Sequence, residues 1–127
     1  MEKRITIAQA LAEYRAADPG GLEDEQAVRW LARLDGRVFR EVMANRRDCP
    51  EIFVLYTADT DHSTEVLIPE PHGAVYTHWL CAQSALLRGE NDRNHDSMAA
   101  FQTAWDGFAA DWIQSHPTVR QGLRIRF

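Results

Sequence analysis

The segment from Asn91 to Ser115 places five large apolar side chains at alternating three- and four-residue spacing. At about 100° per residue they fall within about an 80° arc of one helix. They are Met98, Phe101, Trp105, Phe108 and Trp112. So bulky a face must pack against other helices, or in part against a neighbouring subunit. The stripe predicts a long helix over 91–115, ended by His116 and Pro117.

Three further helices are expected upstream of this one. Thr6 followed by Gln9 fits a capping box that opens a helix running to about Ala17. The second spans about 24–45, with acidic residues at its start, where the helix dipole favours them. The third spans about 71–88, with proline in its first turn. Its expected core face carries Val75, Trp79, Ala82 and Leu86.

Two short apolar runs, 52–56 and 65–68, flank a polar loop and predict a two-stranded β-hairpin. Beyond the last helix, Leu123, Ile125 and Phe127 alternate with arginines and predict an extended tail. The tail could add a strand to a neighbouring subunit, or a third strand to the hairpin. Residues 1–127 should therefore form a single, mainly α domain. It comprises four helices, a small two-stranded hairpin insert and a flexible or docking tail over 117–127.

Charge and hydropathy exclude several classes of protein. A net charge of −5 argues against general affinity for nucleic acid or anionic membranes. No apolar run approaches the roughly 18 residues that a membrane span needs. The N-terminal residues carry no signal-peptide core, so a cytoplasmic protein is expected. The two cysteines, Cys49 and Cys81, are then most simply free thiols.

No catalytic, metal or cofactor site is expected. His78 and Cys81 lie one helical turn apart, but no zinc-binding spacing surrounds them, and no third residue would orient a Cys–His nucleophile. The loop that starts at Asp59 echoes a calcium-binding loop, yet its sixth position is Thr64 where the sharp turn needs glycine. The sequence therefore predicts that the protein is not an enzyme and has no cofactor.

Charged residues suggest contacts instead. Arginines repeat along the second helix, nearly opposite its apolar face, at Arg29, Arg33, Arg37 and Arg40. They could form a solvated face, contact phosphate or bind carboxylates of another protein. The polar loop carries Asp59, Asp61 and Glu65, most simply as a solvated tip. Asp35 falls inside the apolar arc of the second helix, so this carboxyl needs a partner and is interpreted as a structural, buried acid.

Two segments together resemble a known family. The first contains Trp30-Leu31, Leu34-Asp35-Gly36 and Glu41. The second contains Pro69-Glu70-Pro71, Tyr76, Trp79-Leu80, Ala82-Gln83, Gly89-Glu90, Arg93, Ser97-Met98, Phe101 and Trp112. In this order, over about residues 5–116, the chain resembles head–tail connector (adaptor) proteins of tailed bacteriophages and prophages.

The resemblance implies a structural protein that forms a ring between portal and tail and continues the DNA channel. Its partners would be further copies of itself, the portal protein and a tail-side connector or tail-completion protein. DNA would pass without sequence-specific binding, and no membrane would be involved. The protein would lie at the head–tail interface of the virion, and in the host cytoplasm before assembly. The alternative is a small helical regulatory or protein-binding module, for example a dimer.

On the connector interpretation, the charged and apolar surface residues acquire roles. The arginine stripe and the tail residues Leu123, Ile125 and Phe127 would form interfaces. Asp59, Asp61 and Glu65 would face the channel or dock the next ring.

Overall fold

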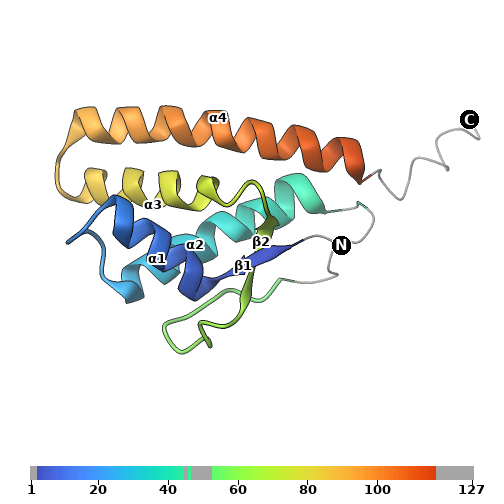
Figure 1. The fold of residues 1–127 in the computed structure, drawn as a ribbon, viewed down its shortest axis with the longest axis horizontal. Helices are drawn as coiled ribbons and strands as arrows, with labels where there is room; N and C mark the ends of the chain where they lie inside the picture. The colour runs from blue at the N-terminus through green and yellow to red at the C-terminus, as the bar shows by residue number, and fades with distance from the viewer. Residues whose placement is uncertain (1–2, 45, 47–52, 117–127) are drawn as a thin grey trace, which may run out of the picture.

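The computed structural model describes residues 3–44, 46 and 53–116. Its elements are β1 (Arg4–Thr6), α1 (Ile7–Ala17), α2 (Asp24–Val38), η1 (Phe39–Met43), β2 (Glu65–Pro69), α3 (Ala74–Leu87) and α4 (Asn91–Ser115). Helix α3 lies between α4 on one side and α1 and α2 on the other (Figure 1). The small sheet lies near the start of α3. The predicted fold class, four helices with two antiparallel strands, is confirmed. The predicted tail, 117–127, lies outside the described residues.

Two helix boundaries follow directly from local sequence signals. At the start of α1, the Gln9 amide donates to Thr6 Oγ1 at 3.2 Å, and the Thr6 amide donates to Gln9 Oε1 at 2.8 Å. This is the predicted capping box, which satisfies two otherwise unpaired amides. Helix α4 has the predicted bounds, and the His116 amide caps it by donating to the Trp112 carbonyl at 2.9 Å.

The second helix departs from the prediction at its C-terminal end. Regular α-helix stops at Val38, and η1 follows as a single π-helical turn, with the Ala44 amide donating to the Phe39 carbonyl at 2.9 Å. The wider turn keeps the successive side chains of Val42 and Met43 buried. The expected end of this helix, residue 45, lies outside the described residues.

The third helix starts later than predicted. The His72 amide donates to the Pro69 carbonyl at 3.1 Å, so the prolines form a turn, and the helix begins at Ala74. Its predicted core face is buried at Val75 and Ala82 and half-buried at Trp79. Leu86, predicted for the core, is instead 55% exposed, because this face is uncovered beyond Ala82.

The sheet pairs different strands from those expected. Strand β2 pairs antiparallel with β1, with Arg4 opposite Pro69 and Thr6 opposite Glu65. The prediction that 52–56 pairs with 65–68 was wrong, since residues 53–56 form no strand and Ile52 lies outside the described residues. The segment instead places its aromatic side chains over α2 and η1. Phe53 stacks on Phe39 at 6.2 Å between ring centroids, and Tyr56 reaches Asp35.

The aromatic stripe of α4 is the centre of the core. Consecutive rings lie 5.1 to 6.3 Å apart between centroids along Trp79, Phe101, Trp105, Phe108 and Trp112. The four stripe aromatics of α4 are buried, and Met98 packs half-buried against them. The stripe is therefore covered within one chain, chiefly by α3. Among the described residues, no helix is both long and apolar enough to cross a membrane.

Candidate functional site

The arginine stripe is divided by the structure into two parts with different surroundings. Arg37 is half-buried between helices: its guanidinium lies 4.4 Å from the ring centroid of Trp105 on α4 and donates to Glu41 at 3.1 Å. It therefore ties α2 to α4. Arg40 lies on η1 and is exposed. Only Arg29 and Arg33 lie together on an open surface.

Those two arginines form part of what we call the α2–α3 patch. It consists of Gln26, Arg29, Trp30, Arg33 and Leu87, which surround a shallow depression of about 180 Å³. The Arg33 guanidinium lies 4.6 Å from the Trp30 ring centroid, a cation–π contact. Leu87 is 60% exposed. Tryptophan and arginine are enriched at protein interfaces, and Leu87 adds exposed apolar surface beside them.

The acidic loop is fixed to the start of α1. The Ile7 amide donates to the Thr64 carbonyl at 2.9 Å, and the Ala8 amide donates to the His62 carbonyl at 3.0 Å. The carboxyl groups stay in solvent, because Asp59, Asp61 and Glu65 are all exposed. The Ser63 amide donates to Asp61 at 2.9 Å, and this hydrogen bond lowers the pKa of that carboxyl. The loop thus presents three acids from a defined position.

Asp35 is the fully buried acid that the sequence predicted, at 0% exposure. Its carboxyl group accepts hydrogen bonds from the Tyr56 and Tyr76 phenols at 2.6 Å each and from the Leu67 amide at 3.0 Å. Burial raises its pKa to about 6, against the opposing effect of these donors. The Asp35 side chain on α2 is therefore hydrogen-bonded to β2, to α3 and to the segment that precedes the acidic loop.

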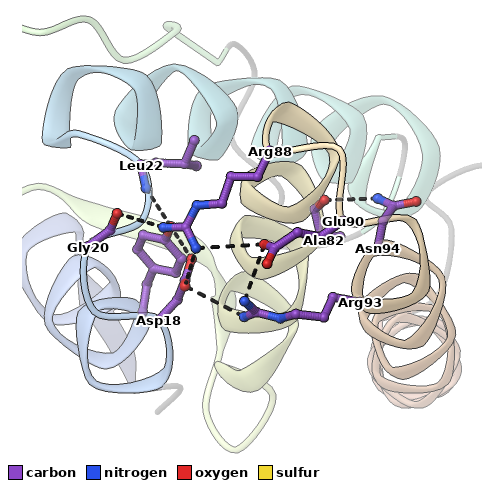
Figure 2. Close-up of polar contacts among 9 residues, drawn as sticks. Asp18, Gly20, Leu22, Ala82, Arg88, Glu90, Arg93 and Asn94 are labelled. Carbon is purple, nitrogen blue, oxygen red and sulfur yellow. Dashed lines mark hydrogen bonds and ion pairs between the residues drawn. The ribbon is translucent and has the colours of Figure 1, made fainter.

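A second polar network joins the α1–α2 loop to the α3–α4 loop. It was not predicted from the sequence. Asp18 is 3% exposed and lies 3.5 Å from Arg88 and 3.6 Å from Arg93. Figure 2 shows both guanidinium groups turned towards Asp18 and Glu90. Arg88 also donates to the Gly20 carbonyl at 2.6 Å. The local sequence signalled only a helix end at Asp18-Pro19-Gly20, since the arginines lie some 70 residues away.

The Asp18 carboxyl is kept ionised by these neighbours. Burial alone would raise its pKa, but hydrogen bonds from Ser84 and Tyr14 and the charges of Arg88 and Arg93 lower it overall. Tyr14 contributes further, because its phenol donates to Asp18 at 2.8 Å and accepts from the Leu22 amide at 2.7 Å. The network fixes the α1–α2 and α3–α4 loops together and is structural.

A groove of about 380 Å³ lies between the Pro69–His72 turn and the last two turns of α4. Its lining residues are Pro69, Glu70, Pro71, His72, Phe108, Asp111, Trp112, Gln114, Ser115 and His116. Across it, His72 Nε2 lies 2.6 Å from Asp111 Oδ2. The His116 ring stacks on Trp112 at 3.6 Å between centroids. No sequence signal pointed to this groove, because its two walls are about 40 residues apart in the chain.

The side chains considered for metal binding form no metal site in the part of the chain that is described. There, no group of three or more His, Cys, Asp or Glu side chains is placed to hold a metal ion. Burial raises the pKa of the Cys81 thiol, which disfavours the reactive thiolate. Cys49 lies outside the described residues.

No protein-family model, no curated protein and no solved structure matches this chain.

Proposed function

We propose that the protein is a structural head–tail connector of a tailed phage or prophage, which forms a ring between portal and tail and continues the DNA channel. This proposal is supported by contacts between the two sequence segments that carry the resemblance. Tyr76 donates to Asp35 at 2.6 Å, and Trp79 Nε1 donates to the Trp30 carbonyl at 3.0 Å. The residues that carry the resemblance are thus contact partners that hold the helices together, so the two segments act as one structural unit in this chain.

A closed ring of identical subunits needs two different surfaces that complement each other. The α2–α3 patch, which carries Arg29 and Arg33, would be one of these two surfaces. Arginine pairs with carboxylates in a fixed, bidentate geometry, so such contacts also define an orientation between neighbours.

The acidic character of the chain suits the channel of such a ring. The net charge of −5 would be multiplied by the number of subunits, and the exposed loop acids would be repeated around the axis. A wall of carboxylates repels the phosphate backbone, so DNA passes without being held. We assign the acidic loop to the channel, with the portal on one side of the ring and a tail-side protein on the other.

The proposal is tested with a single charge reversal in the α2–α3 patch. Arg33→Glu should prevent incorporation into rings on portal particles, measured by co-sedimentation, while circular dichroism shows unchanged helical content. Arg40→Glu is the matched control: the same change on the same stripe, at an exposed position outside the patch. Equal incorporation of both variants would contradict the patch as an interface. If the protein forms a stable dimer that does not bind portal particles, the result would favour the alternative of a regulatory module.

A further inference from the structure

The groove at the end of α4 combines apolar walls with negative charge. Phe108 and Trp112 form one wall, and Pro69 and Pro71 form the other. The Glu70 side chain is at the rim, and the Asp111 side chain is 66% exposed. The α4 C-terminus also closes the groove, and the last carbonyls of a helix carry a partial negative charge. The site therefore suits a segment that alternates apolar and cationic side chains.

Two further observations indicate a binding site. Arg46 Nη1 already donates to the His116 carbonyl at 3.1 Å, so this helix end accepts a guanidinium group. In addition, the indole Nε1 of Trp112, a side chain that is 2% exposed, has no hydrogen-bond acceptor among the described residues. Buried donors are nearly always paired, and a small shift of the indole ring towards the groove would let a main-chain carbonyl of a bound segment supply this acceptor.

We propose that this groove binds the C-terminal segment, residues 118–127, of a second copy of the chain. That segment carries three arginines and no acid, and it alternates them with apolar side chains. The side chains concerned are Arg120, Leu123, Arg124, Ile125, Arg126 and Phe127. Its charge complements Glu70 and Asp111, and its apolar side chains can pack on Pro71, the exposed apolar residue of the groove. The inference rests on the proposed ring, which supplies the neighbouring copy.

The position of the groove favours a neighbour over the same chain. His116, the last described residue, itself lines the groove. The groove runs back along α4 from His116 to Phe108, so the segment of the same chain would have to run antiparallel to α4 immediately after the helix ends. Ten extended residues reach about 33 Å without any reversal. This distance exceeds the radius of gyration of a domain of this size, roughly 14 Å, and is enough to reach an adjacent subunit.

The test uses two full-length chains, each with one cysteine, in a background in which Cys49 is replaced by Ser and Cys81 by Ala. One chain carries Gln114→Cys in the groove, and the other carries Ile125→Cys in the segment. After mixing on portal particles and mild oxidation with glutathione disulfide, we expect a covalent pair of the two chains as the main cross-linked product. Neither chain can cross-link internally, so this product reports contact between copies. Thr103→Cys, an exposed position of α4 outside the groove, is the matched control and should yield several-fold less.

Charge reversal tests specificity in the same assay. Asp111→Arg in the groove chain should lower the yield, and Arg124→Asp with Arg126→Asp in the other chain should restore part of it. A yield no higher than that of the Thr103→Cys control overturns the inference. Rings that form without the covalent pair would also overturn it while leaving the proposed function intact. The covalent pair without closed rings would support the groove and contradict the ring.

Discussion

The phenol of Tyr76 on α3 donates a 2.6 Å hydrogen bond to the carboxyl group of Asp35 on α2, and both side chains are completely buried. Tyr76 also accepts a hydrogen bond from the Ile68 amide at 2.8 Å, so this pair connects α2, α3 and β2. A carboxyl group in such a place is retained only if its donors satisfy it. The pair therefore contributes to the stability of the fold as part of a buried polar cluster.

Removing the Asp35 carboxyl should destabilise the protein strongly. Asp35→Ala leaves two buried phenols and the Leu67 amide without their acceptor, and we expect a loss of about 3 kcal/mol in the free energy of unfolding. Tyr76→Phe removes one donor and should cost about 1–2 kcal/mol. Urea denaturation measures both. Asp59→Ala, at an exposed acid, is the control and should change stability by less than about 0.5 kcal/mol. Equal effects at Asp35 and Asp59 would refute the assignment.

The same carboxyl should make stability depend on pH. Its pKa is about 6 in the folded protein, against 3.8 for an ordinary aspartate, so the folded state binds this proton more tightly than the unfolded chain. The resulting stabilisation is fully present below about pH 4 and is lost as the pH rises through 6. It corresponds to about 3 kcal/mol. Asp35→Asn removes this titration, so its stability relative to wild type should improve from about pH 4 to about pH 7. A constant difference would contradict the raised pKa.

Arg88 should contribute to stability through the network in Figure 2. Arg88→Ala removes the 2.6 Å hydrogen bond to Gly20 and one of the two guanidinium groups beside the buried Asp18. We expect a loss of about 1–2 kcal/mol. Because the pKa of Asp18 is lowered, its stabilisation is present above the unfolded pKa and disappears as the pH falls through the folded one. The acid-dependent loss should therefore be smaller in the variant.

Arg29→Ala is the control for Arg88→Ala. Its guanidinium pairs with Glu25 on the exposed face of α2 at 3.0 Å, with both side chains more than 60% exposed. Such pairs contribute little, and the change should stay within about 0.5 kcal/mol. If Arg29→Ala and Arg88→Ala cost the same, the loop network does not stabilise the fold.

Local sequence patterns predicted the helices well. The capping residues Thr6 and Gln9 fix the start of α1, and the aromatic spacing with Pro117 beyond it fixes α4. The burial of Asp35 was also predicted from its position in the helix. The regular period of an α-helix means that a residue's place in the sequence determines the helix face on which it lies.

Features that depend on distant contacts could not be predicted in this way. Strand β1 is too short to signal a strand by itself and is defined by its partner 60 residues away. The sequence position of Arg37 places it on the arginine stripe. In the fold, however, its guanidinium packs on Trp105 of α4 and is half-buried between the helices. The groove and the Asp18 network likewise join segments that only the tertiary fold brings together.

The acidic loop should repel DNA if it lines the channel. Asp59→Lys with Asp61→Lys should slow DNA passage and cause DNA retention that weakens as salt is raised. Electron microscopy of particles and ejection kinetics measure this effect. Glu13→Lys with Asp106→Lys makes the same change in charge at exposed positions of α1 and α4 and is the control. Normal ejection from the loop variant would place the loop outside the channel.

A connector must close into a ring on a portal, and this closure can be measured directly. The most direct measurement is native mass spectrometry, combined with electron microscopy, of the purified chain mixed with portal particles from the same genome. The connector account predicts a single closed ring of many copies bound coaxially to each portal, whether or not the free chain is monomeric. A chain that remains a monomer or a dimer and leaves the portal bare would contradict it.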